Sequence, residues 1–298
     1  MNEGFAYRSV VPADTAGQDV LAHLAHRYTH STREEWRARL AAGEVELDGV
    51  PAAPGDRLRA GQLLVWRRPP WEEPAVPLAY AVLHQDDDVL VVAKVRGLPT
   101  VPNGGFLTHT LLHLVRARTP AAVPMHRLGR GTSGLVLFAL TAPARSALAR
   151  DFREGRIGKA YRALVTGRPP GDAFSIDTPI GLVPHPRLGH VHAAAPRGRR
   201  ALSHVRVLER RPASSLVEVE IPTGRPHQIR IHLAAAGHPL IGDPLYGVGG
   251  GPLADPALPG AAGYWLHARR LRFTHPATGA PVVVECQPPG PLALSQSL

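Results

Sequence analysis

The sequence has a single cysteine, Cys286, in 298 residues. A disulfide framework and a zinc site built from several thiolates are therefore excluded. No stretch approaches the roughly 18 apolar residues that a membrane-spanning helix requires. The first residues also lack the apolar run and cleavage site of a signal peptide. We therefore expect a cytoplasmic protein that does not contact a membrane.

Acidic residues are fewer than basic ones: the chain has 24 Asp and Glu against 34 Lys and Arg, which gives a formal net charge of +10. Nearly all of the cations are arginines. A guanidinium binds phosphate through a planar fork and stays charged when it is partly desolvated. The excess favours an anionic polymer, RNA or DNA, as the partner. A GC-rich genome that encodes arginine freely would give the same composition, so composition alone leaves both explanations open.

The pattern of the first 66 residues predicts a small α/β domain. Helices are expected over residues 18–28 and 31–43, the second with a capping box in which Ser31 or Thr32 precedes a glutamate by three positions. Two strands follow, over 45–52 and 56–66. Arg33 and Arg37 lie on the second helix in a cluster of arginines, which favours RNA contact over a simply solvated face. Residues 67–77 contain four prolines and are expected to form a semi-rigid linker.

The second domain is expected over residues 78–289, followed by a disordered tail over 290–298. Its strands outnumber its helices and come in hairpin-like pairs, beginning with 79–97 around three aspartates. This predicts an α+β fold with a mainly antiparallel mixed sheet flanked by helices. The three aspartates are interpreted as a polar turn, because no spaced metal-ligand pattern follows them.

The stretch HRLGRGTSG, residues 126–134, resembles an active-site turn that lacks a carboxylate and a thiol. A second stretch, residues 222–247, places Thr223, Arg225, His227, Arg230 and His232 among apolar residues. Polar groups interleaved with buried ones are typical of a binding or catalytic site. A third stretch, KAYRALVTG, contains Tyr161 on a predicted strand.

Metal binding was weighed because the chain has 16 histidines. His185, His190 and His192 lie in a basic loop, residues 185–200, that is rich in proline and glycine, but no carboxylate stands beside them. A serine hydrolase is also disfavoured, because no serine occupies a G-x-S-x-G turn. We expect neither a metal nor a cofactor.

On these motifs the chain from about residue 78 to 289 resembles the RluA family of RNA pseudouridine synthases, with TGRPHQIRIHLAAAGHPLIGDPLYG close to the family pattern throughout. Residues 1–66 resemble a degenerate S-four-like ribosomal-protein RNA-binding domain. The resemblance implies isomerisation of uridine in rRNA or tRNA, without a cofactor, after the base has left its stack. It also implies that Arg127 fills the vacated space, that Tyr161 stacks on the uracil and helps with proton transfer, and that Arg230 pairs with a catalytic aspartate. His126, Arg225 and His227 are expected to contact RNA.

Gly129 occupies the position of that aspartate, which is the family's essential nucleophile, and a glycine cannot attack carbon or take a proton. Thr132, Ser133 and Asp243 are the candidate substitutes, with His126 as a base that could activate a hydroxyl, but Asp243 is expected to support a turn. Two hypotheses follow for a chain expected to act as a monomer on structured RNA. It is either a uridine isomerase with an unrecognised reacting group, or a catalytically silent RNA-binding or RNA-remodelling protein.

Overall fold

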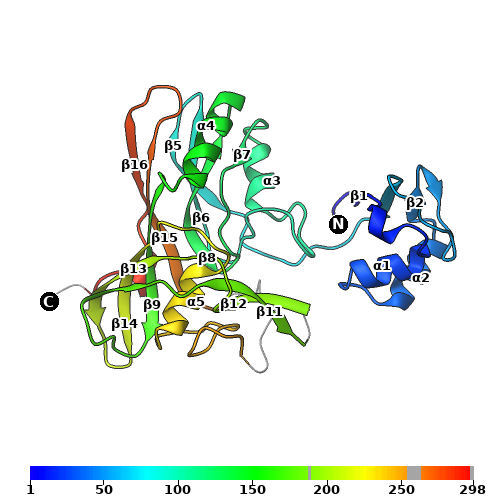
Figure 1. Cartoon of the computed structure of the whole chain (residues 1–298). Helices are drawn as coiled ribbons and strands as arrows, with labels where there is room; N and C mark the ends of the chain where they lie inside the picture. The colour runs from blue at the N-terminus through cyan, green and yellow to red at the C-terminus, as the bar shows by residue number, and fades with distance from the viewer. Residues whose placement is uncertain (187–188, 254–262, 296–298) are drawn as a thin grey trace. The chain divides into compact units, whose positions relative to one another are not determined.

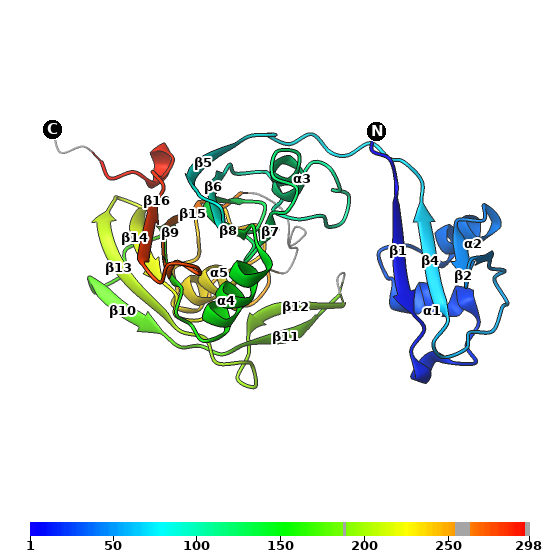
Figure 2. The same cartoon turned by 90° about the horizontal axis from the view of Figure 1, so that it is seen from above.

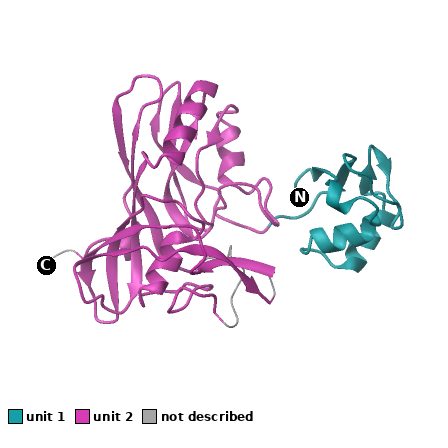
Figure 3. Cartoon of the chain, viewed as in Figure 1, with its two compact units in different colours: residues 1–73 teal, residues 74–298 magenta. Residues whose placement is uncertain are grey.

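The structure, a computed structural model, describes residues 1–186, 189–253 and 263–295. The chain divides into two compact units, Met1–Glu73 and Pro74–Leu298 (Figure 3). Each unit has its own apolar core cluster, so each is described by itself.

Unit 1 combines a four-stranded sheet, of order β1-β4-β2-β3, with two helices. Thr32 caps the second helix and forms the predicted capping box with Glu35, whereas the Ser31 hydroxyl accepts from Arg39 instead. Strand β4 continues to Arg68, beyond the predicted end of the domain. The elements are β1 (Phe5–Val10), α1 (Val20–Arg27), α2 (Arg33–Ala41), β2 (Val45–Leu47), β3 (Val50–Pro51) and β4 (Leu63–Arg68), with a 3-10 turn over Ala13–Thr15.

Unit 2 is built on a ten-stranded mixed sheet whose main path is β10-β13-β14-β9-β15-β8-β6-β5 (Figure 1). The only parallel pairing in its described ladders joins β15 to β8, and the others are antiparallel. This confirms the predicted α+β fold. The strands are β5 (Tyr80–Gln85), β6 (Val89–Lys94), β7 (Val123–Pro124), β8 (Thr132–Ala139), β9 (Gly158–Thr166), β10 (Ala173–Ile176), β13 (Ser203–Arg210), β14 (Ser214–Glu220), β15 (Leu266–Thr274) and β16 (Pro281–Glu285).

Three helices contribute buried residues to the main core cluster of unit 2 (Figure 2). They are α3 (Leu111–Arg116), α4 (Ala142–Arg153) and α5 (Gln228–Ala235). Thr141 caps α4 as its sequence predicts, and Gly237, with a φ of +85°, follows the end of α5. Asp86 accepts hydrogen bonds from the backbone N–H groups of Asp88 and Val89, so the three aspartates form a hairpin turn as predicted.

Two sequence-based expectations in unit 2 are wrong. Much of the predicted 185–200 loop is a two-stranded ribbon of β11 (Ile180–His185) and β12 (Gly189–Ala194), and residues 187–188 lie outside the described residues. The tail is ordered over 290–295, because Leu292 is buried in a small cluster with Leu164 and Leu216 and a 3-10 turn covers Gly290–Leu292. Residues 296–298 lie outside the described part of the chain.

Candidate active site

The HRLGRG turn precedes β8 and is held at two points, one by the last residue of β6 and one by the segment that follows it. Thr100 bonds both the carbonyl and the N–H of Leu128, and the ammonium of Lys94 reaches the carbonyl of Arg130 at 3.4 Å. Burial lowers the pKa of Lys94 to about 7. Gly129 lies between Leu128 and Arg130, the two residues held by these hydrogen bonds, and it is exposed. The turn therefore presents position 129 on a fixed backbone.

A buried tyrosine fills the space beside Gly129. A Cβ added at position 129 would lie 2.9 Å from the hydroxyl oxygen of Tyr264, and a Cβ at Gly131 would lie 2.9 Å from two of its ring carbons. The same hydroxyl lies 3.2 Å from the Thr132 hydroxyl. Tyr264 is only 2% exposed. The two glycines of the turn therefore make room for this ring.

Arg230, within α5, also contacts the Tyr264 ring. Its guanidinium carbon is 4.3 Å from the centroid of Tyr264 and 4.9 Å from that of Tyr246. Its Nε and Nη2 each donate to Asp243 over 2.7 Å. Gly129 cannot supply the carboxylate that the resemblance implies as the partner of Arg230, and Arg230 is paired with Asp243 instead.

Asp243 supports a turn as expected and also neutralises Arg230. Its Oδ1 accepts from the backbone N–H groups of Leu245 and Tyr246 as well as from Arg230. The two side chains are 3% and 1% exposed. Because an isolated buried charge is costly, this bidentate pair is what allows a guanidinium to lie inside the core.

Tyr161 joins the same part of the core from β9. It pairs in register with Ala268, which in turn pairs with Gly134 of β8. It belongs to the core cluster that contains Leu128, Ile229 and Tyr264. Burial raises the pKa of Tyr161 to about 12, so its phenol stays protonated at neutral pH. The three motifs singled out in the sequence therefore converge.

His126 holds the turn against β8. Its Nε2 accepts the backbone N–H of Leu137 over 3.1 Å, and its ring packs against Phe152. Burial, with a further contribution from the charge of Lys159, lowers the pKa of His126 to about 4. The RNA contact predicted for this residue would have to be made by a neutral ring.

His227 adopts a left-handed φ of 55° at the start of α5 and bonds the Tyr246 hydroxyl through Nδ1 at 2.7 Å. That hydroxyl donates its own proton to the carbonyl of His192. In the bond with His227, Nδ1 is therefore the protonated donor and the tyrosine oxygen is the acceptor. Burial first, and then the charge of Arg230, lowers the pKa of His227 to about 4, with a smaller effect from Arg127. Arg127 is exposed on the turn.

The remaining predicted RNA-binding arginines lie at different places. Arg225 donates from Nε to the carbonyl of Arg200. Arg33 and Arg37 are exposed on α2 of unit 1, where Arg37 pairs with Glu34 at 3.1 Å. Because the positions of the two units relative to each other are not determined, Arg33 and Arg37 are described only within unit 1.

Ser133, considered as a substitute nucleophile, faces away from Tyr161. Its hydroxyl bonds Nδ1 of His267 at 2.9 Å. His267 alternates on β15 with Leu266 and Ala268, which pack in the main core with Tyr161. The Ser133–His267 pair is therefore on the opposite face of the sheet.

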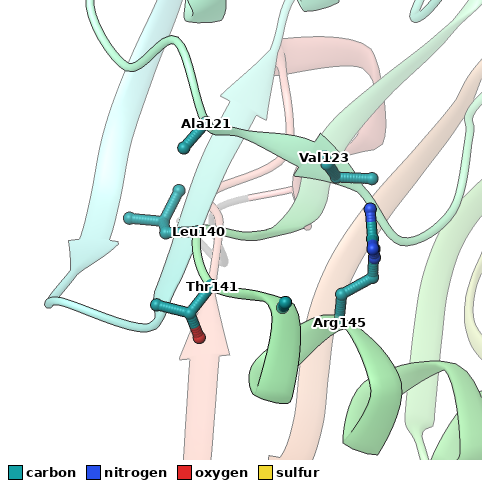
Figure 4. Close-up of a pocket in the computed structure, with 6 residues that line it drawn as sticks. Ala121, Val123, Leu140, Thr141 and Arg145 are labelled. Carbon is teal, nitrogen blue, oxygen red and sulfur yellow. The ribbon is translucent and has the colours of Figure 1, made fainter.

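Two hollows lie away from the turn. One of about 80 Å³ is at the far end of β8, between Leu140 and the start of α4 (Figure 4). The other, of about 290 Å³, is lined by Lys159, His204, Glu220, Arg270 and Arg272 among others, so three cations and one carboxylate face it. Within the described part of the chain no group of three or more His, Cys, Asp or Glu residues is arranged to hold a metal, and no helix is long and apolar enough to cross a membrane.

Comparison with known proteins identifies the fold. Residues 88–235 match the model of a family described as RNA pseudouridylate synthase. An uncharacterized RNA pseudouridine synthase of Synechocystis is 44% identical over 86% of this chain and 89% of that protein. The chain belongs to the RNA pseudouridine synthase family. This confirms the resemblance found in the sequence.

Other pseudouridine synthases are similar over comparable lengths. Ribosomal large subunit pseudouridine synthase D of Neisseria meningitidis is 38% identical over 94% of this chain and 78% of that protein. Among solved structures, human RNA Pseudouridylate Synthase Domain Containing 1 is 28% identical, with a TM-score of 0.58 over 73% of this chain and 87% of that chain.

Sequence reasoning missed Tyr264 in this pseudouridine synthase site. It lies more than 130 positions from the turn that it packs against, and it precedes β15 without a local motif. Lys94 was also missed, although a single lysine at the end of the apolar run VLVVAK is a detectable signal, because buried lysines are rare.

Proposed function

We propose that this chain isomerises uridine to pseudouridine in structured rRNA or tRNA, as a cytoplasmic monomer and without a metal or cofactor. The single observation that supports the proposal is the arrangement around Tyr264. Its ring contacts Arg230, and its hydroxyl reaches the space beside Gly129. The uridine frame implied by the family is thus kept as one contiguous site.

The surroundings suit an RNA base. Tyr161 offers an uncharged aromatic ring for stacking and a hydroxyl that can pass a proton, and Arg127 is exposed on the turn that precedes β8. The hollow beside Lys159 offers Arg270 and Arg272 to backbone phosphates. Arg33 and Arg37 supply exposed cations on unit 1. Binding to RNA is therefore expected to weaken steeply as salt concentration rises, because phosphate contacts release counterions.

The site differs from the family pattern by lacking a carboxylate on the turn, and we treat this degenerate turn as compatible with catalysis. Asp243 does not supply the missing group in this proposal. Its Oδ1 already accepts three hydrogen bonds, and its side chain is 1% exposed. Its role is to hold Arg230 and the following turn.

The decisive experiment compares pseudouridine maps of rRNA and tRNA from cells with and without the gene. We expect at least one site to disappear on deletion and to return when the wild-type chain is expressed. Expression of Arg230→Ala or Tyr161→Phe should not restore it. Tyr161→Phe is the milder variant, because it removes only a hydroxyl and keeps the core filled.

The opposite outcome is equally clear. If the maps are identical while the purified chain binds the same RNA with a steep salt dependence, the chain is a silent RNA-binding protein on a synthase fold. If it binds RNA weakly and without salt dependence, both hypotheses fail.

A further inference from the structure

Tyr264 is the group that stands where the turn lacks its carboxylate. We propose that the hydroxyl of Tyr264 is the nucleophile that replaces the carboxylate missing at Gly129. This inference rests on the proposed function, because it names the reacting group of that isomerisation.

The position of the hydroxyl supports this role. The carboxylate oxygens of an aspartate lie about 2.4 Å from its Cβ, by ordinary bond lengths and angles. The Tyr264 hydroxyl oxygen lies 2.9 Å from the point where a Cβ of residue 129 would be. The Tyr264 hydroxyl therefore lies directly beside the point from which a carboxylate at position 129 would extend. It reaches this place from the start of β15 rather than from the turn.

As a nucleophile, Tyr264 must lose its proton when it attacks C1′ and must later depart from C1′ as a phenolate. Its surroundings suit both steps. Arg230 places its guanidinium 4.3 Å from the ring centroid, so a cation faces the ring in a buried site. Asp243 fixes that guanidinium by two hydrogen bonds. The Thr132 hydroxyl lies 3.2 Å from the Tyr264 hydroxyl and helps to orient it. Tyrosine serves as the nucleophile at a glycosidic carbon in sialidases, so the chemistry is within its range.

The reaction balances without another reactant. The Tyr264 oxygen forms a bond to C1′ of the ribose while the C1′–N1 bond breaks, and the phenolic proton moves to the departing uracil. The base turns, and C5 forms a bond to C1′ while the C1′–oxygen bond to Tyr264 breaks. The proton on C5 then returns to the phenolate. The product is the C-linked isomer, and Tyr264 ends as it began.

Other candidate groups are less well placed. The Ser133 hydroxyl bonds His267 on the opposite face of the sheet. The Thr132 hydroxyl shares its place with Tyr264 but has no adjacent base in the described structure, and an unactivated hydroxyl is a poor nucleophile. Tyr161 has no atom within 4 Å of a Cβ at position 129, where only the hydroxyls of Tyr264 and Thr132 lie among the described residues.

The test uses the full-length chain and total RNA from the deletion cells, labelled with tritium at C5 of uridine. Isomerisation releases that tritium to water because C5 loses its hydrogen. Tyr264→Phe keeps the ring against Arg230 and removes only the oxygen. We expect its single-turnover rate to fall at least about 100-fold, while its affinity for the same RNA stays within about threefold.

Thr132→Val is the matched control, because it removes the other partner of the hydrogen bond and leaves the Tyr264 oxygen. We expect it to keep at least about a tenth of the wild-type rate. If Thr132→Val is as impaired as Tyr264→Phe, the hydrogen bond is structural and the inference is overturned. Thermal melting of each variant separates misfolding from loss of chemistry.

Two further results distinguish the inference from the function on which it rests. A Tyr264→Phe variant that releases tritium at more than a tenth of the wild-type rate overturns the inference and leaves the isomerase intact. A wild-type chain that releases none, under conditions in which it binds the RNA, overturns the proposed function and the inference together.

Discussion

Gly129 and Tyr264 share one space: the hydroxyl oxygen of the tyrosine lies 2.9 Å from where a Cβ of residue 129 would stand. Neither this glycine nor Gly131 has a positive φ, so the backbone itself would accept other residues. Glycine is therefore required at these two positions by the space that the Tyr264 ring occupies, and not by the backbone conformation of the turn. This makes the pairing open to test by stability measurements alone.

Gly129→Ala is expected to lower the free energy of unfolding by about 1–3 kcal/mol, because the added methyl overpacks the site. Adding Tyr264→Phe should recover much of that loss, because the colliding oxygen is gone. Gly131→Ala is the matched control, since its methyl meets ring carbons that phenylalanine retains. Denaturant unfolding of the single and double variants measures the two couplings. Equal rescue at both positions would contradict this packing.

Asp243→Asn is expected to destabilise the fold by about 3–5 kcal/mol, because it leaves the Arg230 guanidinium buried without its anionic partner. The double variant Arg230→Met, Asp243→Asn removes the charge as well and should be more stable than the single Asp243→Asn variant. Urea unfolding at neutral pH compares them. If the two variants are equally stable, burial of the unpaired charge is not the main cost.

Acid should weaken the fold through His126 and His227, whose pKa values burial lowers to about 4. Between that value and the unfolded pKa near 6.5, the unfolded chain binds protons that the folded chain rejects. Stability is therefore complete above about pH 6.5 and falls with decreasing pH by up to about 1.4 kcal/mol per unit for each histidine. Below about pH 4 their contribution levels off.

Unfolding free energies from pH 8 to 4 test this dependence, with His126→Gln and His227→Gln as the variants. Each should show a shallower fall than the wild type across that window. His190, which is exposed on β12, provides the control, and His190→Gln should leave the slope as it is. A slope that neither variant reduces would mean that carboxylates dominate the acid response.

The C-terminal segment should contribute to stability. Leu292 is 1% exposed against Leu164 and Leu216, and Arg211 donates to the carbonyls of Pro291 and Ala293. Leu292→Ala is expected to cost about 2 kcal/mol, at the low end for a buried leucine because its cluster is small. Leu294→Ala, at an exposed position, is the control. Thermal unfolding of the two variants compares them, and equal melting temperatures would contradict the packing.

Local patterns in the sequence predict the parts of this fold that local contacts stabilise. The Thr32 capping box, the Asp86 turn and the glycine after α5 each act within a few residues, so their signals are local. The ordered tail depends instead on Leu164 and Leu216, far away in the chain. The Tyr264 contact with Gly129 likewise joins distant segments, and periodicity carries no information about such a meeting.

The residues of the three site motifs could be predicted because they lie in three short stretches of sequence. The side chains that surround Gly129 could not be predicted. The sequence indicates that Gly129 lacks a side chain, but the identity of the side chain that fills the space depends on where β15 enters the sheet. The partner of Arg230 was uncertain for the same reason, although Asp243 is only 13 residues away.

Strand β15 has a consequence for the order in which the protein can be assembled during translation. It stands in the middle of the sheet, between β9 and β8, yet it is almost the last strand to be synthesised. Until the ribosome has released residues 266–274, the sheet exists as two separate halves, each with an open strand edge. The arrangement around Tyr264 is therefore completed only after β15 has been synthesised, and a chain cut short before β15 carries every motif but no assembled site.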